Sequence, residues 1–552
     1  MRCTRNGQFL LLITLGMSFS VWGQGGGSQA GRGAAAQGAA TQQAGAAGRG
    51  GGRGGGGAGG GATGFYNYDP TALSGIPIGD VQPVETHQKI TINGEAIAYT
   101  ARAGYLPLRN ATTGLAAAHL FYTLYAKDGA SDAGTRPLLF FTGGAPGVAT
   151  SWQEFGGLGP KRMKWAADGT AGLPPYGWVD NPNTLLGQAD LVFVNPVGTA
   201  YSRPDQPSRG PDFWTTAADI AALGEFVRDF IDTYDRRNSP LFLVGEDFGT
   251  ARAAGLAGYL VDHQIQVNGV VLFSMTLSAD ALAGDTQYLT LLPSEIMAAW
   301  YHKKLAPELQ ALSAEQIADQ ARQFASRAYL HALYKGDRMT LEERTKVVAD
   351  LARLTGLSKA FIVNNNLRIT LDRFNGELLR DQRRVLSYSD ARVTGYVPAS
   401  SGGGRGGFGG VISAGAIDYN QVNLAGGFLA AYQAYLLREL TFAKSSGIFY
   451  LMSGGVGTFT SNGSDDASLA SAFARNPRMR LFAGVNFFDL NIPFYATEFT
   501  LAHLNVSPEV RAHNITVSHF EAGQMVYVDN KSLAKLHGEL VKFINEAIAP
   551  AR

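Results

Sequence analysis

Residues 241–250 read LFLVGEDFGT, an apolar run that leads into Gly245 and Gly249 with three residues between them. A buried strand that enters Gly-x-x-x-Gly and then a small-residue helix is typical of a nucleophile elbow, the sharp turn that exposes one side chain. Glycine is needed on both sides because strand and helix pack tightly at such a turn. The central position holds Asp247 rather than serine. We therefore expect an elbow backbone with an unusual residue at its tip.

The composition is that of a globular protein. The chain has 552 residues, of which 45% are hydrophobic and 16% charged, and its formal net charge is +1. This length suits one large domain with an insertion, or two domains. The near-neutral charge shows no basic stripe, so we expect neither a nucleic-acid partner nor binding to an anionic membrane.

The N-terminus predicts export. Arg2 and Arg5 precede an apolar stretch at 9–21, and small residues follow it, so we expect residues 1–23 to be a signal peptide. The apolar stretch is too short for a stable membrane span, although a tethering helix is the alternative. Cys3, the only cysteine, lies inside this segment. The mature chain would therefore lack disulfides and function in the periplasm or outside the cell.

Composition and periodicity divide the rest of the chain. Residues 24–64 are rich in Gly and Ala and predict a disordered tether. The patterns of 65–280 and 441–552 predict the two parts of one sheet domain. Successive amphipathic helices predict a helical cap at 281–440, and SSGGGRGGFGG at 400–410 predicts a loop within it.

The strand patterns predict the kind of sheet. KITINGEAIAYTARAG and AAHLFYTLYAKDG alternate apolar and polar residues and carry turn signals, which favours an antiparallel start. Short apolar runs follow, with helical patterns between several of them: PLLFFTGG, ADLVFVNPVG, PLFLVGED, GVVLFSM, MRLFAGVNFFD and ITVSHFEAG. Strands that alternate with helices predict a mostly parallel α/β sheet.

Three further motifs follow predicted strands. FFTGGAPG places glycines where backbone N–H groups face a developing oxyanion. Asp489 lies just past the strand of MRLFAGVNFFD, where an acid partner belongs. HFEAGQMVY follows the last strand, where a base would complete the order nucleophile, acid, base.

The motifs RPLLFFTGGAPG, GGLGPKRM, DLVFVNPVGTAYSRP, LVGEDFGTARAAGLAGYL, FFDLNIPFYATEFTLAHL and FEAGQMVY, in this order, resemble the serine carboxypeptidases, particularly their bacterial branch. The resemblance spans about residues 85–550. It implies an α/β-hydrolase fold with a mostly parallel central sheet and an inserted helical cap, and it implies peptidase ancestry.

The resemblance also assigns the positions of a catalytic triad. The serine of the family falls on Asp247, its acid on Asp489 and its histidine on Gln524. Glu246 matches the glutamate that helps to hold the substrate carboxylate, and Thr142 replaces the asparagine that does the same.

The loop around Thr142 would complete the substrate site. Gly143 follows Thr142 in the substrate-binding loop, and the oxyanion donors would be the N–H groups of Gly144 and Phe248. Ala145 is inserted relative to the family pattern, which changes the setting of Gly144.

Two of the three triad positions lack the chemistry of the family. An aspartate is a poor nucleophile toward an amide, and Gln524 cannot accept and return a proton. Losing one or all members of such a triad costs on the order of 10⁶ in turnover. We expect a degenerate homologue that binds a peptide or small ligand under the cap.

The sequence leaves two enzyme alternatives open. One is an active serine-type carboxypeptidase, and the other is a hydrolase with Asp247 as nucleophile, as in the haloalkane dehalogenases. The second needs a base, and His519 stands five residues from Gln524, about 16 Å along a strand and on its opposite face. We therefore expect no rescue by His519.

No cofactor or metal is expected. The other histidines lack metal-ligand spacing. Glu246, Asp247 and Asp489 would form an acidic cluster able to hold a cation or share a proton, but no further ligand is indicated. The expected partner is a peptide or small molecule, and the oligomeric state is left open.

Overall fold

The computed structural model describes residues 82–549 apart from 93, 131–132, 167–168, 276, 397–417, 443–448, 453–455, 457–458 and 462–464. All described residues belong to one compact unit, Gly38–Arg552. The predicted signal peptide, the predicted tether and the predicted loop at 400–410 lie outside the described residues.

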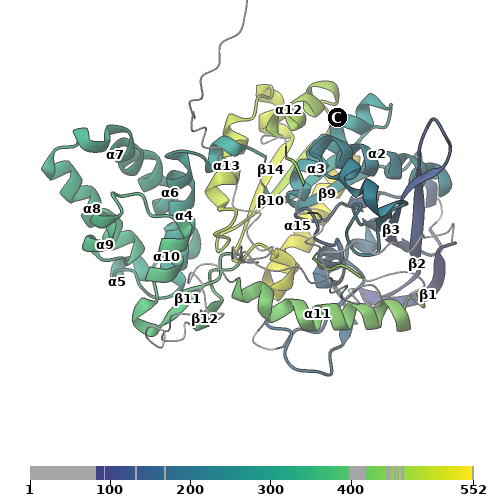
Figure 1. The fold of residues 1–552 in the computed structure, drawn as a ribbon, viewed down its shortest axis with the longest axis horizontal. Coiled ribbons are helices and arrows are strands. Elements are labelled where there is room, and N and C mark those ends of the chain that lie inside the picture. The colour runs from purple at the N-terminus through teal and green to yellow at the C-terminus, as the bar shows by residue number, and fades with distance from the viewer. Residues whose placement is uncertain are drawn as a thin grey trace, which may run out of the picture. The chain divides into compact units, whose positions relative to one another are not determined.

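Within the described residues, ten strands form one central sheet. Figure 1 shows the sheet with helices packed around it. In spatial order the strands are β1 (Val84–Ile92), β2 (Glu95–Arg109), β3 (Ala116–Lys127), β7 (Asp190–Val194), β4 (Leu138–Phe141), β9 (Leu241–Asp247), β10 (Gly269–Met275), β13 (Arg480–Asn486) and β14 (Ile515–Phe520), with β8 (Arg203–Pro204) beside β3. The first three strands and β7 pair antiparallel, and the strands from β7 to β14 pair parallel. The predicted antiparallel start and parallel centre are both confirmed.

The strand that leads to Asp247 is buried on both faces. Phe242 and Val244 of β9 lie in the hydrophobic cluster on one face of the sheet, and Leu241 and Leu243 lie in the cluster on the other. Alternate side chains of a strand point to opposite faces, so a strand covered on both faces is a continuous apolar run. The apolar run of the sequence therefore has a direct structural cause.

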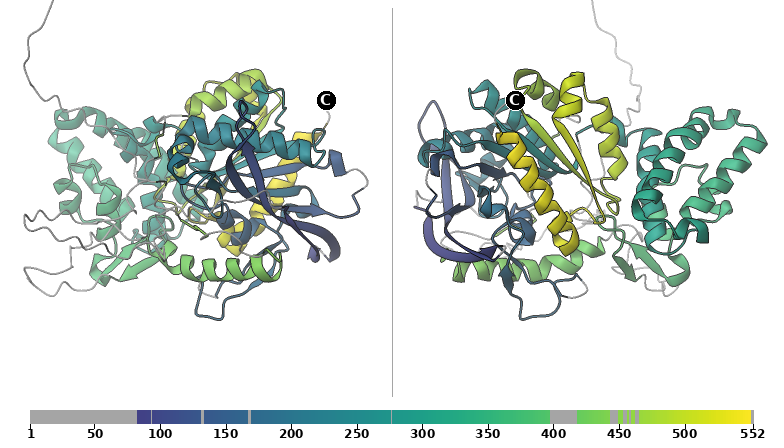
Figure 2. Two further views of the ribbon diagram at one scale, coloured as in Figure 1. Left: turned by 45° about the vertical axis from the view of Figure 1, so that its right-hand side comes forward. Right: turned by 180° about the vertical axis from the view of Figure 1, so that it is seen from behind.

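Helices cover both faces of the sheet (Figure 2). The cluster on one face includes residues of α2 (Thr216–Thr233), α3 (Gly249–Asp262), α12 (Asp466–Arg475) and α14 (Pro508–His513), and the cluster on the other includes residues of α1 (Ser151–Gln153), α11 (Tyr419–Arg438) and α15 (Asn530–Ile548). Beside α1, β5 (Lys161–Met163) pairs with β6 (Trp178–Asp180). Nowhere in the described residues is a helix both long and apolar enough to cross a membrane.

The small residues of α3 serve helix packing as well as sheet packing. The pattern predicts that they let α3 approach the sheet, and Ala251 and Ala254 are indeed buried in the cluster on that face. Gly255 instead faces α2, because a Cβ there would lie 2.2 Å from Ile220 Cδ1. Gly258 faces α12, where a Cβ would lie 2.8 Å from a nitrogen of Arg475. These two glycines therefore allow close contacts between helices.

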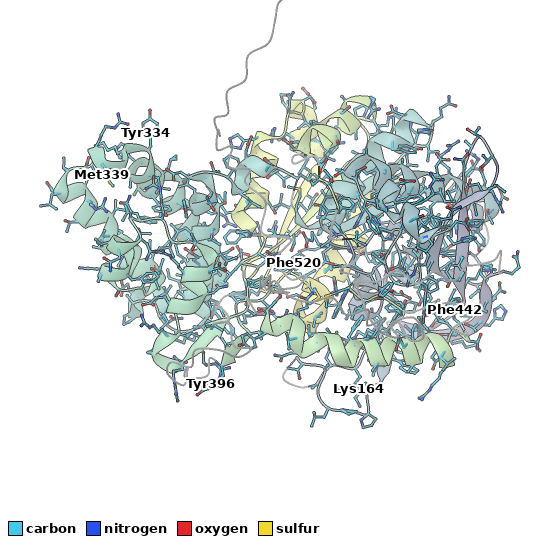
Figure 3. The ribbon with its side chains drawn as sticks, viewed as in Figure 1. Lys164, Tyr334, Met339, Tyr396, Phe442 and Phe520 are labelled. Carbon is cyan, nitrogen blue, oxygen red and sulfur yellow. The ribbon has the colours of Figure 1, made fainter. Side chains whose placement is uncertain are left out.

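Between β10 and β13 the chain forms a group of helices beside the sheet, and Figure 3 labels Tyr334 and Met339 at its outer end. They are α4 (Thr286–Tyr301), α5 (Pro307–Gln310), α6 (Ala314–Phe324), α7 (Leu330–Lys335), α8 (Leu341–Thr355), α9 (Lys359–Asn364) and α10 (Leu371–Glu377). Capping boxes start α6, with Ser313 and Gln316, and α8, with Thr340 and Glu343. A short hairpin of β11 (Arg384–Leu386) and β12 (Thr394–Tyr396) follows. The sequence pattern does not predict it, because strands of three residues are too short to show an alternation of apolar and polar side chains.

Helix α11 packs on the sheet side although it falls inside the range predicted for the cap. Phe428 and Tyr435 lie in the cluster of one sheet face. The Tyr432 hydroxyl donates to Glu154 Oε2 at 2.6 Å, and the Tyr125 hydroxyl from β3 donates to the other oxygen at 2.5 Å. The helices that pack with one another in the cap thus end with α10, and the domain boundaries stay predictions.

The cap also holds the chain segment that follows β13. Phe487, Phe488 and Leu490 are buried in the hydrophobic cluster of the cap. Arg322 of α6 forms an ion pair of 2.7 Å with Glu498 of α13 (Phe494–His503), which begins just after this segment. The loop with Asp489 is therefore fixed by the cap and the sheet together.

Candidate functional site

The predicted turn at residues 245–249 is confirmed as a sharp strand-to-helix turn. Strand β9 ends at Asp247, α3 begins at Gly249, and Asp247 has a φ of 54°, in the left-handed region. A Cβ at Gly245 would lie 2.0 Å from the Gly249 carbonyl oxygen, and a Cβ at Gly249 would lie 1.9 Å from the Gly143 carbonyl oxygen. No side chain fits at either position, so glycine is required at both by space.

Asp247 and Gln524 meet across 277 positions of sequence. The Gln524 Nε2 amide donates a hydrogen bond of 3.2 Å to Asp247 Oδ2. In a serine triad the nucleophile donates a hydrogen to the base. Here the residue in the base position is the donor and the residue in the nucleophile position is the acceptor. The direction of this hydrogen bond is therefore opposite to that between the nucleophile and the base of a serine triad.

The Asp247 carboxyl is surrounded by protein although the residue keeps some exposure. Burial raises its pKa to about 6, while hydrogen bonds from the Phe248 N–H and the Gln524 amide act in the opposite direction. The carboxyl is therefore ionised above about pH 6. The Phe248 N–H, expected as an oxyanion donor, interacts with the Asp247 carboxylate in this structure.

Glu246, the residue before the tip, is buried beside Asp247. Its Oε2 accepts a hydrogen bond of 2.7 Å from the Tyr527 hydroxyl. Burial, together with the charge of Asp247, raises the pKa of Glu246 to about 8. At neutral pH Glu246 is therefore protonated and Asp247 is the ionised member of the pair. Tyr527 lies three residues after Gln524, in the motif FEAGQMVY, and no feature of the motif singled it out.

Asp489 is fully buried, and its carboxyl oxygens accept hydrogen bonds from its own loop and from β10. Its Oδ1 accepts from the N–H groups of Asn491 at 3.0 Å and Ile492 at 2.9 Å, and its Oδ2 accepts from the Ser274 hydroxyl at 2.8 Å. Burial raises its pKa well above the ordinary value. In the described part of the chain no hydrogen bond joins Asp489 to the Gln524 side chain. The acid position therefore orients no partner in the base position.

Ser274 and Asn486 link the acid and base loops instead. Asn486 Nδ2 donates to the Ser274 hydroxyl and to the Gln524 carbonyl oxygen, both at 3.2 Å. Ser274, near the end of β10, has a φ of 46°, and the pairing of β10 with β9 shifts register beside it. The backbone of Gln524 is thus held by residues that the sequence motifs did not single out.

The glycine loop after β4 is tied to the elbow by backbone contacts. Thr142 is buried, and both its N–H and its hydroxyl donate to the Val244 carbonyl oxygen, at 3.0 and 3.2 Å. The Glu246 N–H donates to the Gly143 carbonyl oxygen at 3.3 Å. Gly144 lies next to β9, where a Cβ would be 3.8 Å from the Glu246 carbonyl oxygen. The Thr142 hydroxyl is therefore directed to the strand backbone.

A buried ion pair between α2 and α3 contacts the glycine loop after β4. Arg252 of α3 pairs with Asp219 of α2, and both side chains are at most 6% exposed. Arg252 also donates to the Gly144 carbonyl oxygen, and its guanidinium lies 5.1 Å from the centre of the Phe248 ring. The sequence signal was a lone arginine in a small-residue helix, five residues after Asp247, and it was missed.

His519 is engaged away from the elbow. Its Nε2 lies 2.6 Å from Glu498 Oε1 and 2.9 Å from a guanidinium nitrogen of Arg322, and its ring stacks on Phe487 at 5.5 Å. A side chain held in this way is not available as a base at Asp247. Among the described residues, no group of three or more His, Cys, Asp or Glu side chains is placed to hold a metal ion.

Comparison with known proteins assigns the chain to a family. Residues 92–374 match the serine carboxypeptidase family. The matched range contains Asp247 and ends before Asp489 and Gln524, so the placement of those two rests on the motifs and on the geometry above. No curated protein matches the sequence.

Solved structures show the fold. Kex1(Δ)p, a prohormone-processing carboxypeptidase from Saccharomyces cerevisiae, is 13% identical, with 81% of this chain and 92% of that chain covered and a TM-score of 0.53. A thermostable carboxyl esterase from Bacillus coagulans is 9% identical, with 81% and 99% covered and a TM-score of 0.34. The first similarity confirms the α/β-hydrolase fold.

Gly249→Ala is expected to destabilise the protein, because the added Cβ would overlap the Gly143 carbonyl oxygen. Overpacking of this kind costs about 1–3 kcal/mol or more. Thermal and urea unfolding would measure the loss. Gly538→Ala, on an exposed turn of α15 where a Cβ meets nothing within 4 Å, is the matched control and should be neutral or stabilising. Equal stability of the two variants would contradict the packing argument.

Gln524→Leu is expected to raise the pKa of Asp247 above about 6. The Gln524 amide donates to the carboxylate, and a donor to the charged form lowers the pKa of an acid. Carbon-13 NMR titration of the aspartate carboxyls would follow the change, and Asp247→Asn identifies the resonance by its disappearance. An unchanged or lower pKa would show that the hydrogen bond does not set the charge of this group.

Proposed function

The chain belongs to the serine carboxypeptidase family, and from that premise we propose that it is a non-hydrolysing member that binds a peptide or small ligand at the elbow. The observation that carries the proposal is the reversed hydrogen bond from Gln524 to Asp247. A serine mechanism needs a hydroxyl whose proton passes to a base. Neither an ionised carboxylate nor an amide supplies that transfer.

The alternative in which Asp247 is the nucleophile lacks a base for its second step. Attack by the carboxylate on a substrate carbon leaves an ester, and a base must then activate the water that hydrolyses it. Gln524 occupies the base position, and His519 is held by Glu498 and Arg322. An ester on Asp247 would therefore form once and accumulate, because no base would activate water to hydrolyse it.

The charges of the site favour a ligand with a cationic or hydrogen-donating end. Asp247 is ionised above about pH 6 and Glu246 is neutral below about pH 8. The nearby guanidinium of Arg252 is paired with Asp219. The Thr142 hydroxyl, in the position that would hold a substrate carboxylate, donates to the strand backbone. A free carboxylate would thus meet a like charge at neutral pH, whereas a basic group would gain an ion pair.

We further propose that this binding takes place outside the cytoplasm. Arg2 and Arg5 before the apolar stretch at 9–21 support cleavage near residue 23 and release into the periplasm or the medium. The yeast carboxypeptidase that shares the fold is described as prohormone-processing, which fits a peptide as the ligand class. Here the peptide would be held and not shortened.

Activity tests separate binding from hydrolysis. The protein should neither react with a fluorophosphonate probe nor release C-terminal residues from blocked dipeptides at acidic or neutral pH, because no activated hydroxyl is present at the elbow. The double variant Asp247→Ser with Gln524→His should gain probe labelling, with Asp247→Ser alone as its control. Labelling or release by the unaltered protein would overturn the proposal.

Calorimetry with matched peptides tests the ligand class. A short peptide with a basic end should bind more tightly at pH 7.5 than at pH 5, by about five- to tenfold, since the Asp247 charge is lost below its pKa of about 6. Asp247→Asn should abolish this dependence, while Asp372→Asn, at an exposed position of α10, should leave it unchanged. Preference for an acidic peptide at pH 7.5 would contradict the proposed ligand.

A further inference from the structure

A pocket lies where the cap meets the end of the sheet. Its volume is about 490 Å³, within the range of pockets that hold small molecules. Its lining comes from the end of α4, the turn between β11 and β12, and the segments that follow β13 and β14: Trp300, Tyr301, Lys303, Arg392, Phe488 and Glu521. Figure 3 labels Phe520, the residue before Glu521, near this junction. None of these residues belongs to the elbow site.

Three aromatic rings form the apolar part of this pocket. Tyr301 stands edge-on to Phe488 with ring centres 5.4 Å apart, and Tyr301 is 43% exposed. The Trp300 indole N–H donates to the Leu312 carbonyl oxygen at 3.2 Å, which fixes the orientation of that ring. Phe488 is only 2% exposed, so Tyr301 is the ring that offers the most surface to a ligand.

The two cations of the pocket differ in their partners. Arg392 is neutralised, with Asp390 at 2.7 Å and Asp529 at 3.2 Å, and it also donates to the Glu521 carbonyl oxygen at 2.8 Å. Lys303 contacts the Trp300 ring, its ammonium 5.4 Å from the ring centre, and among the described residues no carboxylate lies within ion-pair distance of it. One positive charge at the pocket thus lacks an anionic partner.

The backbone places Lys303 at this position. Its φ is 58°, in the left-handed region that a lysine adopts rarely, and it follows directly on the end of α4. The Lys303 N–H donates to the Trp300 carbonyl oxygen at 3.1 Å and the Lys304 N–H to the Ala299 carbonyl oxygen at 2.9 Å, the pattern that ends an α-helix with a left-handed residue. The end of α4 therefore holds the backbone of Lys303 at the pocket.

We propose that this pocket binds a small aromatic carboxylate, with its ring against Tyr301 and its carboxylate on the Lys303 ammonium. A cationic ligand is disfavoured because cations already stand on two of the rings, Lys303 on Trp300 and Arg392 on Phe488, each at 5.4 Å. A multiply charged phosphate is disfavoured because the lining also includes Glu521, whose ion-pair partner is Lys531 at 3.8 Å, so only one cation of the lining is left to bind an anion. A ligand with one negative charge on a planar apolar ring system fits the Lys303 ammonium and the aromatic lining.

The pocket adjoins the two loops of the candidate elbow site. Phe488 precedes Asp489, and its N–H donates to the Ala522 carbonyl oxygen at 3.0 Å. Gly523 packs against Asp390, since a Cβ there would lie 2.4 Å from the Asp390 Cβ. A ligand in the pocket would therefore contact the loops that carry Asp489 and Gln524, through Phe488 and Glu521, and its binding does not require the function proposed for Asp247.

Three ligands that share one ring system test the proposal by calorimetry on the full chain: indole-3-acetate, tryptamine and indole-3-ethanol. Indole-3-acetate is expected to bind about tenfold more tightly than the neutral alcohol, with tryptamine the weakest, because only the anion pairs with Lys303. Lys303→Met should reduce the affinity for indole-3-acetate to that for the alcohol. Equal binding of the three ligands, or no binding of any at millimolar concentration, would overturn the proposal.

Control variants locate the site. Lys359→Met, an exposed lysine of α9, and Asp247→Asn should both leave indole-3-acetate binding unchanged. Tyr301→Leu, at a partly exposed position, should weaken all three ligands together by removing a ring contact, and it serves as a second probe if Lys303→Met does not fold. A loss of binding in Asp247→Asn with retention in Lys303→Met would place the ligand at the elbow and refute the assignment.

Discussion

The contact between the start of α3 and the loop after β4 is the constraint on which the candidate site depends. A Cβ at Gly249 would lie 1.9 Å from the Gly143 carbonyl oxygen, and one at Gly245 would lie 2.0 Å from the Gly249 carbonyl oxygen. The ends of β4 and β9 and the start of α3 thus pack with their backbones in direct contact. This packing imposes the left-handed conformation of Asp247. The position of the tip side chain is set by the backbone, so the residue there changes the chemistry while the turn stays the same.

The strand-to-helix turn is supported by an ion pair that is buried away from water. Arg252 and Asp219 are paired and almost fully buried, and Arg252 also bonds the Gly144 carbonyl oxygen. Removing one partner of such a pair typically costs about 3–5 kcal/mol because the other charge stays buried and unpaired. The geometry of the glycine loop is therefore coupled to the integrity of α2 and α3. This support does not depend on which residue occupies the tip of the elbow.

The sequence predicted the sheet and the elbow because their signals are local. Buried parallel strands are continuous apolar runs, and the spacing of Gly245 and Gly249 reflects a steric limit within five residues. The pairing of Arg252 with Asp219, and of Ser274 with Asp489 across 215 positions, has no such local signature. Helix α11 is a further case: its aromatic face shows that it is buried, but its period does not say whether the cap or the sheet buries it.

The hydrogens at the elbow are the physical basis of the proposed loss of hydrolysis. The Gln524 amide hydrogen that bonds Asp247 does not ionise near neutral pH, so the contact has no proton to transfer. The titratable protons here belong to carboxyl groups, with a pKa of about 6 at Asp247 and about 8 at Glu246. A change of pH across this range alters the charge presented to a ligand and leaves the donor between the two triad positions unchanged. Under the proposed function, the site would select a ligand by its charge, and the hydrogen bond between Gln524 and Asp247 would supply no proton for cleavage.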